Sequence, residues 1–347
     1  MNLRPALLWL HRYLGLLATV PMVLLAVSGA ILTFEVELDQ AINPAYWHVT
    51  PGGQPMAWQD VIAAAKRAYP GEPPQSVRFP PAHDVAAELT LKGGRMISVD
   101  PYTGRVLGSR RREDVLTSRI HQFHTHLLID KWGQWITGTS TIILLVLGPS
   151  GVVLWWRRKG LSIKWSAPWR RVNYDAHHAA GIYGLVPWMV LGLSGGIMVF
   201  EGSLRPAPLK HDARSPSTRS SSARAHSVGL DAALDAASRA LPGAQITLIG
   251  LPANPAGTFL AYMKFPEDRT PAGRSRVAVN AADGSVLWTE NSRTAPAPTR
   301  LWNLNRPIHT GDIFGWPTRI LACLASLALA LQALSGLWMW WPRRNRK

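Results

Sequence analysis

The chain has 347 residues, with 37 Lys and Arg against 21 Asp and Glu and a formal net charge of +16. Its single cysteine, Cys323, excludes a disulfide framework, ligation of an iron–sulfur cluster and covalent attachment of haem through Cys-x-x-Cys-His. The positive charge does not indicate a nucleic-acid-binding protein, because most of it lies in short segments that flank apolar stretches.

Four apolar stretches predict membrane-spanning helices. Each contains or approaches the roughly 20 apolar residues that cross about 30 Å of hydrocarbon. Tryptophans stand at the ends of several, where indole rings favour the membrane–water boundary. The stretches are Trp9–Phe34, Trp135–Trp156, Ile182–Phe200 and Ile313–Trp341.

Basic residues mark one side of the membrane. If four helices alternate in direction, the segments before the first, between the second and third, and after the fourth lie on the same side. The positive-inside rule makes that side cytoplasmic, which predicts a multi-pass membrane protein with both termini in the cytoplasm. These residues are Arg4, Arg12, Arg157, Arg158, Lys159, Lys164, Arg170, Arg171, Arg343, Arg344, Arg346 and Lys347.

The chain is an internal duplication. From His11 and from His177, glycine follows at +4, proline at +10, Ser-Gly at +17 and +18, and Phe-Glu at +23 and +24. From His124 and from His309, Ser-Gly follows at +26 and +27 and two tryptophans at +31 and +32. Such agreement without gaps indicates two repeats of one unit, each made of a helix, an outer segment and a second helix.

The two outer segments repeat as well. Trp58–Pro70 and Leu230–Pro242 have the pattern of an amphipathic helix that ends at Pro-Gly. Strand-like runs with a turn follow at Ser98–Gly108 and Ala278–Trp288. The composition of Arg205–His226 predicts a flexible linker. We therefore predict a membrane all-α four-helix bundle with two small α+β periplasmic domains in tandem duplication.

The predicted boundaries follow from these elements. They are residues 1–35 for the first helix, 36–118 for the first outer domain, 119–157 for the second helix, 158–174 for a cytoplasmic loop, 175–201 for the third helix, 202–305 for the linker and second outer domain, and 306–347 for the fourth helix with a cytoplasmic tail.

Four of the eleven histidines occupy matching positions in the two repeats: His11, His124, His177 and His309. Ionisable groups inside a membrane are costly and usually functional, and imidazole is a good axial ligand for haem iron. By topology the first and third lie near the cytoplasmic face and the other two near the outer face. This predicts two b-type, non-covalent haems, one held by His11 and His177 and one by His124 and His309.

Other interpretations of these residues remain open. The role of ligand given to His124 could also belong to His121 or His126, and that given to His177 could belong to His178. The remaining histidines have no repeat counterparts and are expected to be exposed: His48, His83, His211 and His226. Zinc is disfavoured because two ligands fall short of a structural site. A stripe of small residues runs along the first and third helices, which suits either close helix packing or room for a macrocycle. Its members are Gly15, Ala18, Ala26, Gly29, Gly181, Gly184, Gly192 and Gly195.

The second helix of each repeat is too long to be straight. At roughly 1.5 Å per residue, a helix from His124 to Trp156 would extend about 48 Å, well beyond the hydrocarbon core. A straight helix would hold the outer histidines far above the membrane. We therefore expect a bend near Gly133 and, in the other repeat, near Gly315.

Four motifs carry a resemblance to a known family: HRYLG at His11, HTHLLIDKWG at His124, YDAHHAAG at Tyr174 and IHTGDIFG at Ile308. Over nearly its whole length the chain resembles the PepSY-associated transmembrane helix proteins, some of which are inner-membrane ferric-siderophore reductases. The resemblance implies PepSY-like outer domains and a dihaem protein whose axial ligands are the four repeat-matched histidines. His126 stands where the family motif has a charged residue.

The predicted function is a dihaem inner-membrane oxidoreductase, a ferric-chelate or siderophore reductase in type, with no catalytic residue assigned. Electrons enter from quinol or a cytoplasmic donor and pass to a periplasmic acceptor, a ferric siderophore, for iron release. The alternatives are a membrane-anchored PepSY module that binds peptide or regulates a protease, and an iron or haem permease. The run Arg110–Arg112 with Arg119 either attracts an anionic chelate or is a solvated charge cluster.

Overall fold

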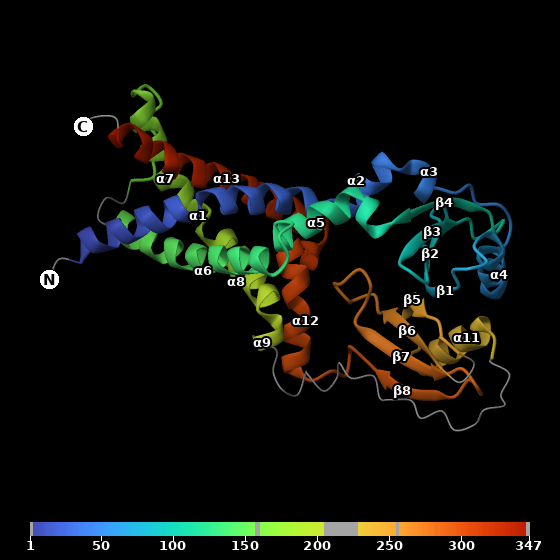
Figure 1. Cartoon of the computed structure of the whole chain (residues 1–347). Coiled ribbons are helices and arrows are strands. Elements are labelled where there is room, and N and C mark those ends of the chain that lie inside the picture. Colours follow the sequence, from blue (N-terminus) through green and yellow to red (C-terminus); the bar gives the residue numbers. More distant parts are fainter. Residues whose placement is uncertain (1–2, 157–159, 205–227, 255–256, 345–347) are drawn as a thin grey trace. The chain divides into compact units, whose positions relative to one another are not determined.

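The computed structural model describes residues 3–156, 160–204, 228–254 and 257–344, which belong to two compact units (Figure 1). The membrane unit comprises Met1–Glu35, Arg119–Arg205 and Asn305–Lys347, and the sheet unit comprises Val36–Ser118 and Pro206–Leu304. Each unit contains segments of both repeats. The predicted linker Arg205–His226 lies wholly outside the described residues. So do His211 and several predicted cytoplasmic residues, namely Arg157, Arg158, Lys159, Arg346 and Lys347.

An eight-stranded antiparallel sheet forms the centre of the sheet unit, with the strand order β4-β3-β2-β1-β5-β6-β7-β8. The strands Ala87–Leu91 and Thr258–Lys264 alternate strictly between buried and more exposed residues, as expected where one face packs on a core. The strands are β1 (Pro74–Arg78), β2 (Ala87–Leu91), β3 (Arg95–Val99), β4 (Val106–Arg111), β5 (Gln245–Gly250), β6 (Thr258–Lys264), β7 (Ser275–Asn280) and β8 (Val286–Glu290).

The sheet overturns the prediction of two separate small domains. β1 of the first repeat pairs with β5 of the second, so that two four-stranded meanders form one sheet. Val77 lies opposite Ile249 in this pair, and the two residues are equivalent, because each stands at the same distance after its repeat's Pro-Gly. A lone four-stranded sheet would leave the N–H and C=O groups along β1 unpaired, and pairing with the equivalent edge satisfies them.

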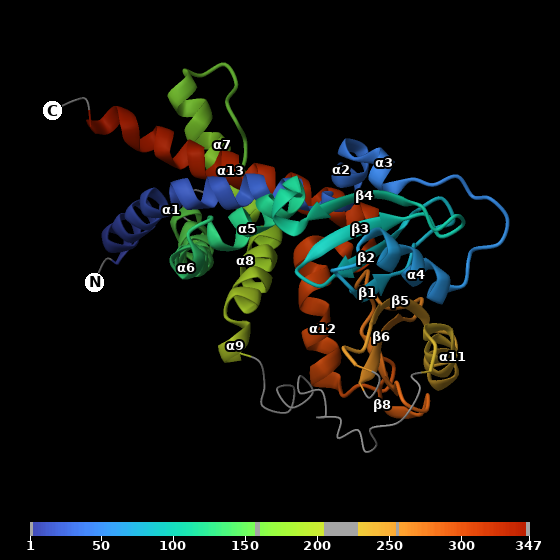
Figure 2. The ribbon, with the colours of Figure 1, turned by 45° about the vertical axis from the view of Figure 1, so that its right-hand side comes forward.

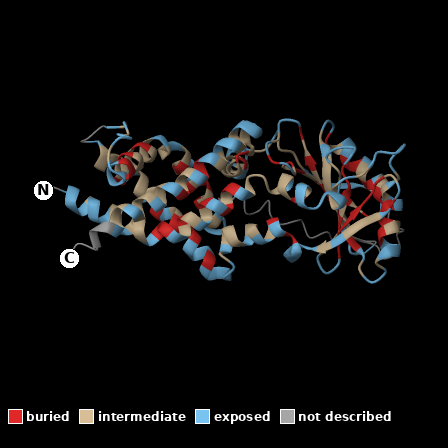
Figure 3. Ribbon diagram, turned by 90° about the horizontal axis from the view of Figure 1, so that it is seen from above, coloured by how far each residue is buried: buried red, intermediate tan, exposed pale blue. Residues whose placement is uncertain are grey.

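Helices α4 (Trp58–Ala68) and α11 (Leu230–Ala240) cover one face of the sheet (Figure 2). Val61 and Ala233 on these helices are fully buried in one core with strand residues such as Leu89, and the buried residues of this unit gather there in Figure 3. Both amphipathic helices were predicted, and their positions are confirmed. The sheet unit also contains the short helices α2 (Glu35–Ile42), α3 (Pro44–Trp47) and η1 (Arg112–Asp114).

Helices of both repeats make up the membrane unit, and they expose much of their apolar surface. Leu17 on the first helix is 69% exposed whereas the adjacent Ala18 is 1% exposed, which is the pattern expected when lipid rather than water surrounds the helices. The helices are α1 (Arg4–Leu32), α5 (Leu116–His126), α6 (Asp130–Trp155), α7 (Trp169–Tyr183), α8 (Leu185–Val199), α9 (Glu201–Leu204), α12 (Ala297–Thr310), η2 (Asp312–Phe314) and α13 (Trp316–Arg344).

The four-helix bundle is wrong as a description of this unit. Among the described residues, three continuous helices are long and apolar enough to cross a membrane, namely α1, α6 and α13. The predicted third span is instead two helices, α7 and α8, which are bent by 61° and pass the same test only together. The bend lies at Gly184, where the Trp188 ring occupies the place of a side chain: an added Cβ would lie 2.4 Å from its Cζ2.

The predicted bends after His124 and after His309 are confirmed. In the first repeat α5 ends at His126 and α6 begins at Asp130; in the second α12 ends at Thr310 and α13 begins at Trp316. Gly133 permits the first bend, because a Cβ there would lie 1.5 Å from the carbonyl oxygen of His126. Any residue with a side chain at this position would collide with the end of α5, so this bend requires glycine there.

The two bends are built from different residues. In the second repeat, glycines at positions 311 and 315 adopt positive φ angles of 83° and 72°, which cost glycine little. In the first repeat the positive φ angles belong to Leu127 (48°), Leu128 (59°) and Asp130 (47°). Non-glycine residues pay about 1–3 kcal/mol each for such conformations, so the first bend stores backbone strain beside His124.

Candidate functional site

The four repeat-matched histidines lie on α1, α5, α7 and α12 of the membrane unit. The structure brings His124 and His309 together: their ring centroids are 6.3 Å apart and their planes are inclined by 48°. Two imidazoles bound to one metal ion from opposite sides have centroids about 6 Å apart, because each metal–nitrogen bond is about 2 Å. We call His124 and His309 the second pair.

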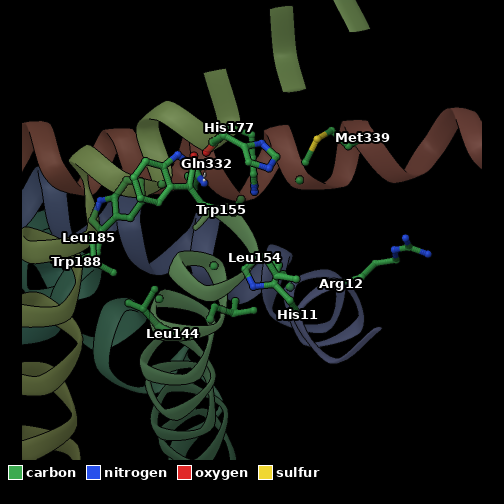
Figure 4. A pocket seen from close by; sticks show the side chains of 18 of the residues that line it. His11, Arg12, Leu144, Leu154, Trp155, His177, Leu185, Trp188, Gln332 and Met339 are labelled. Carbon is green, nitrogen blue, oxygen red and sulfur yellow. Dashed lines mark hydrogen bonds between the residues drawn. The ribbon is translucent and has the colours of Figure 1, made fainter. Parts of the chain in front are cut away.

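His11 and His177, which we call the first pair, line one cavity of about 420 Å³ (Figure 4). The cavity lies among α1, α6, α7, α8 and α13, and most of its wall is apolar. Arg4 and Arg12 line it as well, and no carboxylate is among the described residues of its wall. Such a cavity suits a large, mostly apolar ligand that carries negative charge.

Each histidine is hydrogen-bonded to the serine of a Ser-Gly pair on another helix of its own repeat. In every case Nδ1 of the ring lies near the serine Oγ. The distances are 2.8 Å for His11 and Ser150, 2.9 Å for His124 and Ser28, 2.6 Å for His177 and Ser335, and 3.0 Å for His309 and Ser194.

These serines fix the tautomer of the rings. A hydroxyl has one proton to donate, and each serine donates it to a carbonyl one turn earlier on its helix, as Ser28 does to Leu24 at 2.7 Å and Ser335 does to Gln332 at 2.7 Å; Ser150 and Ser194 do the same. The serine therefore accepts from the histidine, whose Nδ1 carries the proton. In the neutral ring, Nε2 is then left with its lone pair.

A backbone carbonyl supports this assignment at His309. Its Nδ1 lies 3.2 Å from the carbonyl oxygen of Leu191 as well as 3.0 Å from Ser194 Oγ. A carbonyl oxygen only accepts hydrogen bonds. The proton of the ring must therefore be on Nδ1.

The glycine of each Ser-Gly pair makes room for the same ring. A Cβ at Gly29 would lie 3.1 Å from Cε1 of His124, and one at Gly195 would lie 2.9 Å from Cε1 of His309. At Gly151 and Gly336 the corresponding distance, to His11 and His177, is 3.4 Å. Serine and glycine together thus orient one imidazole, and the arrangement occurs four times.

The stripe of small residues serves both of the purposes that the sequence left open. Gly15 and Gly181 line the cavity of the first pair, which favours room for a ligand. Gly192 instead packs against the neighbouring helix, because a Cβ there would lie 3.2 Å from Cδ2 of Leu144. The stripe is therefore partly a ligand surface and partly a helix contact.

The competing histidines have different surroundings. His178 lines the cavity beside His177, but its Nδ1 bonds the carbonyl of Tyr174 at 2.8 Å and its ring packs on the Tyr174 ring at 4.2 Å. His126 is exposed and its Nδ1 bonds Thr125 Oγ1 at 2.7 Å. Neither contacts a Ser-Gly pair. His48 and His83 are exposed, as predicted.

Sequence reasoning missed the serines as partners of the histidines. Their signal was present, because Ser-Gly recurs at a fixed distance from every one of the four histidines. Spacing along one helix cannot tell which ring on another helix a serine will meet. The packing of α1 with α6 and of α7 with α13 brings His11 and His177 to their serines. His124 and His309 meet theirs where α5 contacts α1 and α12 contacts α8.

One arginine of the run before α5 is not available to an anionic ligand. Arg110 in the sheet unit lies 2.8 Å from Asp39 and 3.5 Å from Glu88, and all three side chains are largely buried. Its guanidinium lies 3.8 Å from the centre of the Tyr46 ring. Burial raises the pKa of Tyr46, and the neighbouring Glu88 raises it further. Arg110 is therefore part of an internal ion cluster.

The model of a family described as the PepSY-associated TM region matches residues 8–343, which is nearly the whole chain. No curated protein matches the sequence significantly. Among the described residues, no group of three or more His, Cys, Asp or Glu is placed to hold a metal ion, so the histidines stand as pairs.

Proposed function

The chain belongs to the PepSY-associated TM region family, and from this we propose that it is a dihaem membrane oxidoreductase. In this proposal His11 and His177 hold one b-type haem, and His124 and His309 hold the other. Electrons cross the membrane to a periplasmic acceptor. The observation that carries the proposal is the set of four Ser–His hydrogen bonds, which leaves Nε2 of every ring as a ligand.

The residues present fit this group. Metal-binding histidines usually donate their other ring N–H to a fixed acceptor, which orients the ring and raises its basicity. The second pair has the ring separation that a shared metal ion requires. The cavity of the first pair combines apolar walls with two arginines, which suits a macrocycle bearing carboxylates. Haem held by two histidines would supply a one-electron redox couple.

The protein's own residues would then perform three tasks. The serines hold each imidazole in one tautomer, so that no proton needs to move when a ligand bond forms. The glycines of the Ser-Gly pairs let the rings approach the facing helices. Apolar residues such as Leu144 and Leu185 surround the first pair and exclude water. The low local dielectric constant then favours the transfer of one charge at a time over that of several.

The direction of transfer follows from the distribution of charge in the sequence. In this proposal both termini lie in the cytoplasm of a bacterium, as the positive-inside rule predicts for this chain, and the first pair lies near that side with the sheet unit in the periplasm. The electron donor would be quinol or a cytoplasmic reductant. The acceptor would be a ferric siderophore, since reduction to Fe²⁺ weakens the binding of iron to hard oxygen ligands.

An absorbance spectrum of the detergent-purified chain, oxidised and then reduced with dithionite, tests the proposal. We expect reducible b-type bands with two haems per chain. H11A and H309A should each remove about half of the haem, whereas H126A, which alters an exposed histidine outside the pairs, should remove none. Protein saturated with haem that shows no such bands would refute the proposal and favour a membrane-anchored binding module.

A further inference from the structure

We propose that Trp188 is the residue through which the electron passes between the two histidine pairs. The inference rests on the proposed function and assigns a path within it. One electron would move per event, from the group that His11 and His177 would hold to the group that His124 and His309 would hold. Trp188 would end unchanged, with no bond made or broken.

Trp188 borders the site of the first pair. Its side chain is 5% exposed and forms part of the wall of the cavity that His11 and His177 also line. Figure 4 shows the three residues around this cavity. A ligand that fills the cavity would therefore contact the indole, and the indole itself is shielded from water.

The same residue lies one helical turn from the site of the second pair. Trp188 and Leu191 are three positions apart on α8, a rise of about 4.5 Å. The Leu191 carbonyl accepts a hydrogen bond from His309, and Ser194 on the next turn contacts the same ring. A short stretch of α8 therefore touches both sites, with Trp188 at its end nearer the first pair.

The indole is held in one orientation. Its Nε1–H donates to the carbonyl of Ala325 on α13 at 2.8 Å, and its ring packs over Gly184 at the bend between α7 and α8. A buried aromatic ring with fixed partners changes little in position when a neighbouring charge changes. A small rearrangement favours fast electron transfer.

The other repeat offers a weaker path. The equivalent of Trp188 is Met22, because each follows the conserved proline of its helix directly. Met22 is 6% exposed and also lines the cavity. Its side chain is a flexible chain of single bonds, whereas the indole has a delocalised π system that couples electronically across its whole width. The two repeats therefore provide one aromatic bridge and one saturated side chain.

The experiment compares W188F and W188M with the unaltered chain and with W169M, a control that makes the same change at a tryptophan that is 62% exposed and outside the wall of the cavity. Both variants of Trp188 lose the hydrogen bond to Ala325, but only W188F keeps an aromatic ring; W188M introduces the residue that the first repeat has at this position. Each protein is placed in liposomes that contain dithionite, and the reduction of external ferricyanide is followed. Haem content and the reduction potentials of both haems are measured on the same samples.

We expect W188M to transfer electrons several-fold more slowly per haem pair than W188F, with the reduction potentials of both haems unchanged. W169M should transfer electrons at the rate of the unaltered chain. Equal rates in W188F and W188M would overturn the assignment, because a purely structural role depends on the hydrogen bond that both have lost. Loss of haem from both variants would also overturn it and make Trp188 a packing residue. An unaltered chain without haem would instead refute the proposed function.

Discussion

The carbonyl oxygen of Leu191 lies 3.2 Å from Nδ1 of His309 and so requires that the ring proton be on that nitrogen. His309 therefore has two acceptors, this carbonyl and Ser194. For His11, the described acceptor is Ser150 at 2.8 Å. His11 should therefore depend more than His309 on its serine for the orientation of its ring and the position of its proton.

S150A should weaken haem binding more than S194A. Removal of an outer-shell partner of a metal-bound histidine typically costs about 10–100-fold in affinity, and S150A should fall within this range. In S194A, His309 keeps its hydrogen bond to the Leu191 carbonyl, so the loss of haem affinity should be smaller than in S150A. The rate of haem transfer to an excess of a haem-scavenging protein measures both, and equal rates in the two variants would contradict the role given to the carbonyl.

G195A should displace the His309 ring. The added Cβ would lie 2.9 Å from Cε1 of that ring, closer than van der Waals contact allows, and the ring is held by two hydrogen bonds that resist its movement. We expect loss of about half the haem, read from the reduced absorbance spectrum. The control is G202A, where no heavy atom lies within 4 Å of the added carbon; it should keep both haems.

L128G should raise the thermal stability of the protein. Leu128 has a φ of 59° and a side chain that is 62% exposed. Glycine at this position relieves backbone strain of about 1–3 kcal/mol and removes only an exposed side chain. L17G removes a similarly exposed leucine from the interior of α1, where glycine costs about 0.5–1 kcal/mol. Unfolding midpoints in one detergent should rise for the first and fall for the second; a fall in both would argue against strain at the bend.

R110A should destabilise the protein strongly, and R111A should not. Removing Arg110 leaves Asp39 buried without its cation and leaves Glu88 with Arg78 at 3.7 Å. Breaking a buried ion pair such as that of Asp39 costs about 3–5 kcal/mol. Arg111 pairs with Glu113 at 3.8 Å, and both side chains are more than half exposed, so its pair contributes about 0–1 kcal/mol. Denaturant unfolding of the whole chain, followed by tryptophan fluorescence, distinguishes the two variants.

Local patterns in the sequence were sufficient for the elements themselves. Apolar stretches located the spans, and repeated amphipathic segments located α4 and α11. The need to return His124 toward the membrane predicted the break before Asp130, because helix length and membrane thickness are both known. These predictions rest on periodicity and length, which a single sequence carries.

Features that depend on contacts between distant segments were not predictable. The pairing of β1 with β5 joins strands that are separated by a membrane helix pair and a loop, and an edge strand does not encode its partner. The bend at Gly184 depends on where the Trp188 ring lies, and glycine is common in straight membrane helices. The assignment of each serine to its histidine depends on helix packing in the same way.

The pair formed by Val77 and Ile249 has an implication for the origin of the chain. Equivalent residues that face each other across an antiparallel edge define a local two-fold axis, the arrangement found at an isologous subunit interface. Every histidine takes its hydrogen bond from its own repeat and meets its partner histidine across repeats. A single repeat would thus present half of each site and one open strand, and two copies would complete both. The present chain has the architecture of a fused homodimer, in which covalent linkage has freed positions such as Met22 and Trp188 to diverge.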